Sequence, residues 1–181
     1  MRPVRQNPGV TIHASDPFAT PEDDRSPVRR LRGRLPSAVT LWTARDGDGR
    51  PAGLTVSSTV VVDGDPGRLL GVLDEESALW EAARATGVFA VAPVPATERL
   101  LADAFAGLMP APGGPFAGHQ WRETDFGPVL EGVPAWAGCR VDAARPMGWG
   151  LLVEATVAHV EVGAAGAGPS LIYFRGRYLG S

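Results

Sequence analysis

Apolar and polar residues alternate in short stretches along most of the chain, and glycine, proline and aspartate separate these stretches. A period of two is typical of strands with one buried face, and short apolar runs between turn residues indicate buried strands. The stretches with either pattern are 38–44, 51–63, 68–73, 88–92, 133–141, 150–162 and 170–174. The chain is therefore predicted to consist mainly of strands.

Three further stretches space their apolar residues as a helix does. The pattern predicts a short helix over 27–34 that begins at a Ser-Pro pair, a second helix over 74–87 and a third over 97–106. The apolar residues that share one side of each helix are Val28, Leu31 and Leu35, then Leu79, Trp80 and Ala83, then Leu100, Leu101, Ala104 and Phe105. The arginines between 29 and 34 are expected to form the solvated side of the first helix.

The order of these elements favours an antiparallel barrel with two or three helices covering its ends. Gly/Asp turn chemistry over 45–51 predicts a hairpin, and the glycines of 163–168 precede a proline and a strand, which indicates a turn rather than a dinucleotide loop. Residues 1–25 are polar and lack periodicity, so we expect a flexible N-terminal arm. Residues 26–181 are then expected to form one domain.

Composition excludes several kinds of chemistry. All 17 basic residues of the 181 are arginine, so neither a lysine Schiff base nor the lysine of a P-loop is available. A net charge of −3 argues against nucleic-acid binding. The single cysteine, Cys139, cannot form an intrachain disulfide, and we find no signal peptide or apolar run of membrane-spanning length. We therefore expect a cytoplasmic protein that binds no membrane.

The stretch 51–63 is unusual because hydroxyl residues follow a glycine in what reads as one strand. Thr55, Ser57 and Thr59 have the same parity, so an extended backbone would place their hydroxyls on one face. Such a row, directly after Gly53, could cradle a phosphate or a ribityl chain. A half-exposed strand with a polar outer face is the simpler interpretation, and the residues alone leave both open.

Other candidate chemistry is sparse. The stretch 173–178 combines two arginines with three aromatic residues, which suits either a ligand wall or a last strand that docks on the barrel. His119 lies in a loop beside an aromatic residue and an arginine, where it could line a pocket. The three histidines lack the spacing of a metal site, and we expect no bound metal. No Gly-x-Ser-x-Gly motif supports serine hydrolase chemistry.

A series of short motifs, in order along the chain, resembles the flavin reductase family of FMN-binding split barrels. The motifs are RLPSAVT at 34–40, GLTVSS at 53–58, FAV at 89–91, FAG at 105–107, GPVL at 127–130, CRV at 139–141 and YFRGRY at 173–178. The resemblance extends from about residue 28 to residue 178 and implies a mainly β fold, a Greek-key antiparallel split β-barrel with peripheral helices. It also implies a homodimer with flavin sites near the subunit interface. The implied activity is NAD(P)H-dependent reduction of FMN, or of FAD, often to supply a monooxygenase.

The resemblance also implies roles for particular residues. The segment Thr55, Val56, Ser57 and Ser58 would hold the flavin phosphate and ribityl chain, and Pro36, Ser37, Ala38 and Val39 would lie beside the isoalloxazine ring. The turn that contains Asp74 and Ser77 would contact the phosphate, and Phe174 and Arg175 would border the nicotinamide. Hydride transfer is carried by the cofactors, so no catalytic acid or base is expected.

The sequence departs from the family pattern on the nicotinamide side. Trp149 and Phe174 stand where many relatives have histidine, and Glu154 stands where glycine is common. A flavin-binding split barrel without efficient NAD(P)H oxidation is therefore an alternative, as a flavin carrier or as a binder of another cofactor such as deazaflavin. Haem is disfavoured because no histidine is well placed to ligate it.

Overall fold

The computed structural model describes residues 26–163 and 168–179, which form fifteen helices and strands. In chain order these are α1 (Pro27–Gly33), β1 (Ser37–Ala38), β2 (Thr40–Arg45), β3 (Pro51–Val56), β4 (Val60–Val62), β5 (Arg68–Leu73), α2 (Ala78–Thr86), β6 (Val88–Pro93), α3 (Arg99–Phe105), β7 (Trp121–Arg122), β8 (Val129–Leu130), β9 (Ala135–Met147), β10 (Gly150–Val162), β11 (Ile172–Phe174) and β12 (Arg177–Leu179). The expected arm over 1–25 and most of the expected turn over 163–168 lie outside the described residues.

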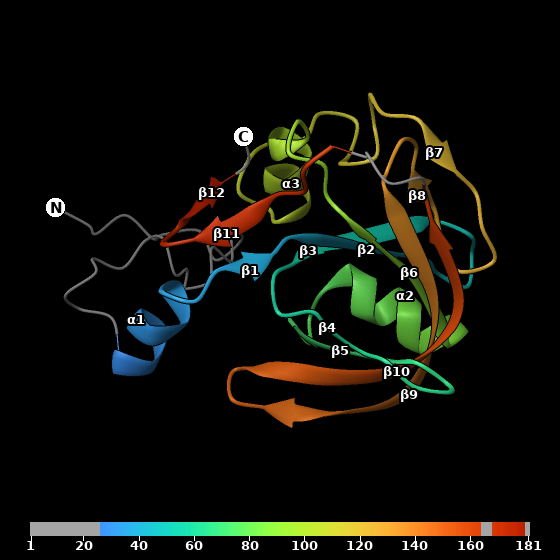
Figure 1. Ribbon diagram of the computed structural model, residues 1–181. Coiled ribbons are helices and arrows are strands. Elements are labelled where there is room, and N and C mark those ends of the chain that lie inside the picture. The colour runs from blue at the N-terminus through green and yellow to red at the C-terminus, as the bar shows by residue number, and fades with distance from the viewer. Residues whose placement is uncertain (1–25, 164–167, 180–181) are drawn as a thin grey trace, which may run out of the picture.

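Seven strands form one antiparallel sheet in the order β3-β2-β6-β9-β10-β5-β4, which curls around the core (Figure 1). The two ends of this sheet meet at Ser58, whose hydroxyl donates to the Val72 carbonyl oxygen at 2.8 Å and accepts from the Val72 amide at 3.0 Å. Smaller sheets β1-β11-β12 and β7-β8 lie outside it. A mainly β, antiparallel barrel with three peripheral helices is therefore confirmed.

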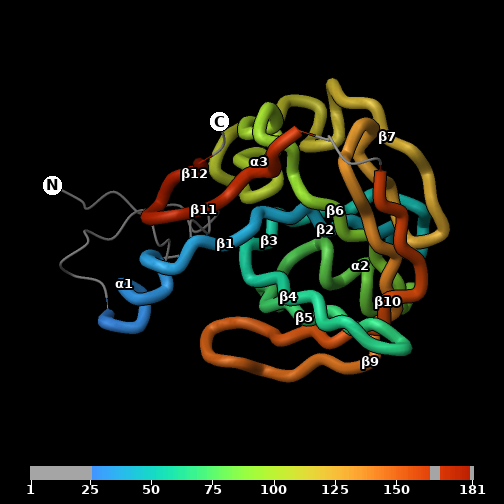
Figure 2. Tube along the Cα trace, in the orientation of Figure 1, coloured from blue at the N-terminus to red at the C-terminus, as the bar shows by residue number. Residues whose placement is uncertain are grey.

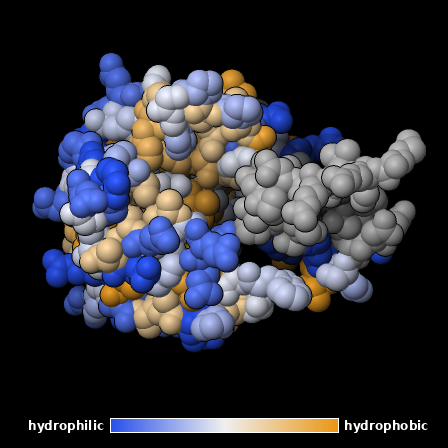
Figure 3. All heavy atoms as spheres, turned by 180° about the vertical axis from the view of Figure 1, so that it is seen from behind, coloured by the Kyte–Doolittle hydropathy of each residue, from blue (hydrophilic) through white to orange (hydrophobic). Residues whose placement is uncertain are grey.

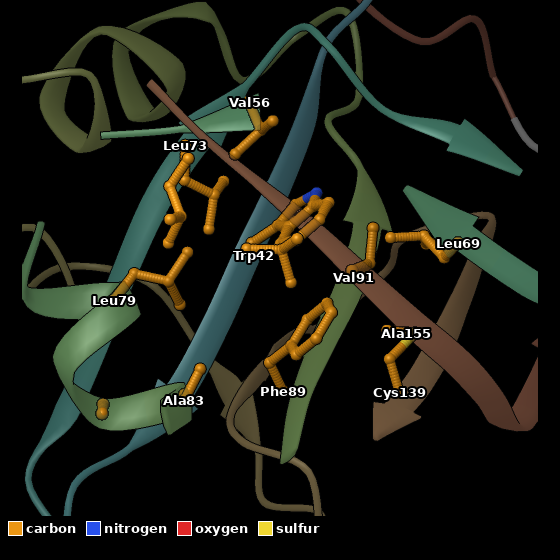
Figure 4. Packing of buried hydrophobic residues seen from close by; sticks show 14 residues of the cluster. Trp42, Val56, Leu69, Leu73, Leu79, Ala83, Phe89, Val91, Cys139 and Ala155 are labelled. Carbon is orange, nitrogen blue, oxygen red and sulfur yellow. The ribbon is translucent and has the colours of Figure 1, made fainter. Parts of the chain in front are cut away.

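The main core lies between the sheet and α2. Trp42 stacks on Phe89 with ring centroids 4.6 Å apart, and Leu79 and Ala83 of α2 pack around them (Figure 4). Burial of each large apolar side chain stabilises the fold by roughly 1.5–3 kcal/mol. A side chain cannot be added at Gly71, because its Cβ would lie 2.5 Å from the Trp42 ring.

The prediction of one continuous strand over 51–63 was wrong, because β3 ends at Val56 and β4 begins at Val60. The Thr59 hydroxyl also does not share a face with the Thr55 hydroxyl. The Thr59 hydroxyl points into the core, where it lies 2.7 Å from the Thr40 hydroxyl and accepts from the Trp42 indole N–H at 3.1 Å. The Thr55 hydroxyl instead donates to the Ala102 carbonyl oxygen of α3 at 2.8 Å. Side-chain hydrogen bonds thus interrupt the strand where the barrel closes.

The helices occur where the pattern predicted them, but two of the three present different faces. In α3, Leu100 is exposed and Ala102 is buried in its place. In α1, the expected apolar stripe of Val28, Leu31 and Leu35 is exposed, and the helix buries no residue. This helix lies outside the barrel, beside β1 and the hairpin of β11 and β12 (Figure 2). The α2 helix matches the prediction, with Ser77 as its N-cap.

One strand, β9, extends further than expected, whereas β10 matches the predicted strand over 150–162. β9 and β10 are each 13 residues long and form a hairpin that projects beneath the barrel (Figure 2). The expected strand over 133–141 covers only the first half of β9, because the paired residues beyond it are largely polar or small and lack an apolar alternation. Trp149 lies in the turn of this hairpin.

Candidate functional site

A hollow open to solvent lies where α1, β1 and the end of β3 face the β11–β12 hairpin and the residues after α3. Its volume is about 180 Å³. These segments are far apart in the sequence, and Figure 1 shows α1, β1 and the β11–β12 hairpin lying side by side at the edge of the barrel. A second core cluster around Leu101, Phe105 and Leu171 supports the floor of this region.

Hydroxyl groups form one wall of the hollow. Ser37 of β1, Thr55 of β3 and Ser57 after β3 all line it, together with the apolar Val39. The Thr55 hydroxyl already donates to Ala102, so it can offer a ligand only its acceptor lone pairs. Four of the residues expected beside a flavin are therefore together in one hollow.

Two tyrosines also line the hollow, and one of them, Tyr173, is the cross-strand partner of Ser37 in β1. Tyr173 of β11 and Tyr178 of β12 are paired across the hairpin, with ring centroids 5.6 Å apart in an edge-to-face arrangement. The turn between the strands consists of Arg175 with φ of 50° and Gly176 with φ of 80°, as a two-residue type I′ hairpin requires. Strand alternation then directs Tyr173 and Phe174 to opposite faces.

The phenol of Tyr178 remains protonated at neutral pH. Burial, followed by the nearby Asp103 carboxylate, raises the pKa of Tyr178 to about 12. The phenol donates its hydrogen bond to Asp103, so Tyr178 offers a planar ligand its aromatic ring.

Arginines of α1 form the third side. The helix is capped by Ser26, whose hydroxyl accepts from the Arg29 amide at 3.3 Å. The other end is held by the C-terminal hairpin, because the Arg175 amide donates to the Gly33 carbonyl oxygen at 2.8 Å. Arg29 and Arg32 are three residues apart, so they share a side of the helix, and both line the hollow. Arg32 and Arg34 are exposed, as expected of a solvated face, whereas Arg29 and Arg30 are partly buried.

The missing side chain of Gly53 leaves room for another part of the protein and not for a ligand. A Cβ at this position would lie 2.6 Å from the Phe105 ring of α3, so the close approach permitted by the glycine is used for packing.

The other residues expected at a flavin site do not line the hollow. Val56 is buried in the core. Pro36, just before β1, and Ala38, within β1, are both exposed. Ser58 closes the barrel through its hydrogen bond to Val72. Asp74 and Ser77 lie at the start of α2: an Asp74 carboxylate oxygen accepts from the Glu76 amide, and the Ser77 hydroxyl caps the helix. The guanidinium of Arg175 lies over the Phe174 ring at 5.3 Å. Trp149 is fully exposed at the tip of its hairpin.

Sequence reasoning did not expect Arg29 and Arg32 at the hollow. The roles expected for Phe174 and Arg175 beside a nicotinamide stay predictions. The available signal for the tyrosines was a two-residue turn at Arg175-Gly176, which pairs Tyr173 with Tyr178 across the hairpin and so places both on one face. No sequence signal shows which side of α1 turns inward.

The other titratable candidates lie elsewhere. His119 is exposed, with its Nε2 atom 3.1 Å from a Glu98 carboxylate oxygen. Burial, followed by the charge of Asp142, raises the pKa of the Cys139 thiol to about 12, so this cysteine is no nucleophile at neutral pH. Among residues 26–163 and 168–179, no group of three or more His, Cys, Asp or Glu side chains could hold a metal. No helix in the same part of the chain is long and apolar enough to cross a membrane.

The hollow thus combines hydroxyl groups, guanidinium groups and aromatic rings. These are the groups that bind phosphates, sugar hydroxyls and planar rings, as a flavin or nicotinamide nucleotide requires. A sequence model of the family described as "Flavin reductase like domain" matches residues 32–180. The chain belongs to this family.

Individual relatives of this flavin reductase-like chain agree with that assignment. It is 32% identical over 172 residues to the FMN reductase (NADH) RutF of Variovorax paradoxus, which covers 95% of this chain and 94% of the relative. It is 31% identical over 167 residues to an NADPH-flavin oxidoreductase of Streptomyces viridifaciens, covering 85% and 81% of the two chains. The resemblance read from the motif series is confirmed.

A solved structure gives the same answer for the fold. The nitrilotriacetate monooxygenase component B of Mycobacterium thermoresistibile superposes with a TM-score of 0.75 and 28% identity, covering 85% of this chain and 84% of the other. The split-barrel prediction for this flavin reductase-like chain is therefore confirmed.

Proposed function

We propose that this chain is an NAD(P)H-dependent flavin reductase, with FMN as the preferred flavin and FAD as the alternative. The observation that carries the proposal is the hollow itself, in which hydroxyls, tyrosines and arginines converge in a member of the flavin reductase-like family. The printed names of the relatives, an FMN reductase (NADH) and an NADPH-flavin oxidoreductase, support both the flavin and the nicotinamide donor.

The residues of the hollow fit a flavin and a nicotinamide by their chemistry. Ser57 and Thr55 suit the ribityl chain and its phosphate, and Ser37 with Val39 suits the side of the ring system. Tyr173 and Tyr178 provide aromatic surface in the same hollow, against which the nicotinamide would lie. Bound flavin and nicotinamide supply the hydride transfer, and the protein contributes orientation, contacts to anions and exclusion of water.

We further propose that the protein is a homodimer. Three consecutive valines of the edge strand β4, Val60, Val61 and Val62, are exposed, as is Trp149 at the tip of the β9–β10 hairpin. An exposed apolar edge strand favours pairing or cover by another chain. Seen from behind, the surface also carries several apolar patches among strongly hydrophilic ones (Figure 3).

Reduced flavin would pass to a monooxygenase. Two similar proteins support this: the component B of nitrilotriacetate monooxygenase, and the reductase component of an FADH(2)-dependent resorcinol hydroxylase of Rhizobium sp., 32% identical over 130 residues. The chain's single cysteine fits a reducing compartment, and we propose a cytoplasmic location.

Purified protein mixed with FMN and either NADH or NADPH tests the activity. We expect flavin-dependent loss of the nicotinamide absorbance under steady-state conditions, and no consumption with either donor would contradict the proposal. A second candidate, a flavin-binding protein without turnover, is favoured by the absence of histidine among the described residues of the hollow. It predicts quenching of FMN fluorescence with NADH and NADPH left intact.

A further inference from the structure

The orientation of α1 is opposite to that of an ordinary surface helix. Its apolar residues face solvent, with Val28 and Leu31 exposed by 76% and 59%, whereas Arg29 is partly buried. Arg32 is exposed, and both arginines line the hollow, so α1 presents two cations to it rather than its apolar side chains.

The charge of the hollow is positive in a protein that is negative overall. Arg29 and Arg32 line it, and no aspartate or glutamate does among the residues that the structure describes there. The whole chain has a formal net charge of −3. A concave site lined by cations attracts anions. The Asp103 carboxylate near Tyr178 opposes this attraction, but it is itself 3.8 Å from the Arg99 guanidinium.

The position of the two guanidinium groups is set by both ends of the helix. The Ser26 cap begins α1, the Arg30 amide donates to the Ser26 carbonyl oxygen at 3.0 Å, and the Arg175 amide holds the Gly33 carbonyl oxygen. Because the chain contains no lysine, strong cationic contacts to an anion must come from arginine. The planar fork of arginine matches the oxygen atoms of a phosphate.

We propose that Arg29 and Arg32 bind the phosphomonoester of the ligand in this hollow, with Ser37 and Ser57, which also line it, donating hydrogen bonds. This inference rests on the proposed function and adds to it the group that fixes the ligand's charged end. Two ligands of such an enzyme carry a phosphomonoester, FMN at its 5′ position and NADPH at its 2′ position. Riboflavin and NADH are their counterparts without it.

The test is the double variant Arg29→Gln/Arg32→Gln, compared with the wild type and with Arg84→Gln/Arg140→Gln. The control pair removes the same charge from exposed positions outside the hollow. Binding of FMN and riboflavin is measured by flavin fluorescence, and KM is measured for NADPH and NADH. Thermal melting checks that both variants are folded.

We expect the double variant to bind one phosphorylated ligand roughly ten- to a hundredfold more weakly, the scale for lost hydrogen bonds to a charged group. Riboflavin and NADH should change less than about twofold, and the control pair should leave all four constants near the wild type. A loss for FMN identifies the 5′-phosphate, and a loss for NADPH identifies the 2′-phosphate.

Equal losses of affinity for the phosphorylated and unphosphorylated ligands would overturn the inference, and so would unchanged affinity for both FMN and NADPH. Either result would leave the reductase proposal standing. A wild-type protein that neither binds flavin nor oxidises NAD(P)H would overturn both.

Discussion

Ser57 and Ser58 are neighbours in sequence, yet their hydroxyl groups have different surroundings. Ser57 lines the hollow, whereas Ser58 bonds both backbone groups of Val72 and closes the barrel. One serine is therefore available to a ligand and the other is committed to the fold. The difference can be tested directly, because the two substitutions to alanine remove the same atom.

We predict that Ser57→Ala weakens FMN binding by about 1–3 kcal/mol, because it removes a hydrogen bond to a charged or hydroxyl-rich ligand. Its free energy of unfolding should stay near that of the wild type. Ser58→Ala, the matched control, should lower the free energy of unfolding by about 1 kcal/mol and change FMN affinity little. Fluorescence titration and urea unfolding measure the two effects, and an FMN affinity unchanged by Ser57→Ala removes that residue from the site.

Cys139 gives a prediction about pH. Burial raises the pKa of its thiol from 9.0 to about 12. The unfolded chain therefore loses its proton first, so the stability held by the neutral thiol is complete below pH 9 and declines as the pH rises toward 12. Melting temperatures between about pH 8 and 10 should fall more steeply for the wild type than for Cys139→Ala. Parallel slopes would show that the thiol is not buried as the structure has it.

At the scale of elements, the packing of β5 on β2 depends on a glycine. A methyl group at Gly71 would meet the Trp42 ring, which is itself stacked on Phe89. We predict that Gly71→Ala lowers the free energy of unfolding by about 1–3 kcal/mol, the usual cost of overpacking. Gly67→Ala is the matched control, because its Cβ would lie 3.7 Å from Val157, an ordinary contact. Equal urea midpoints for the two variants would contradict this packing.

Local patterns predicted the elements well because hairpins and helix caps depend on neighbouring residues. The β2–β3 hairpin and the Ser77 cap of α2 both follow from short stretches of sequence. The break between β3 and β4 could not be predicted from a short stretch, because it depends on a contact between Thr59 and Trp42. The side of α1 that faces the protein could not be predicted either, because the helix end is held by a hydrogen bond from the Arg175 amide to the Gly33 carbonyl oxygen, two residues far apart in the sequence.

The same limit applies to the candidate site. Ser37, Val39, Thr55 and Ser57 were expected near a flavin and do line one hollow, and the aromatic stretch 173–178 does form one of its walls. Which tyrosines face inward follows from the β11–β12 register, and the arginine side follows from the placement of α1. Positions of Asp74, Ser77, Phe174, Arg175 and Trp149 around a bound cofactor stay predictions.

At the scale of the whole molecule, the exposed valines of β4 give a test of the homodimer. Val61→Asp should shift the protein from dimer to monomer in sedimentation velocity, because a carboxylate on an apolar edge strand opposes pairing. Val160→Asp is the control, since Val160 of β10 is also exposed, at 58% against 69% for Val61. A dimer unaffected by Val61→Asp would place the interface elsewhere, and a monomeric wild type would remove the proposal.

The central claim is that this barrel brings a flavin and a nicotinamide together for hydride transfer. Its most direct test is the absorption of FMN after anaerobic mixing of the protein, FMN and an excess of NADH or NADPH. The account predicts that the visible flavin band bleaches, far faster than in the same mixture without protein. A flavin band that stays unbleached with both donors, at protein concentrations where FMN is bound, would contradict it.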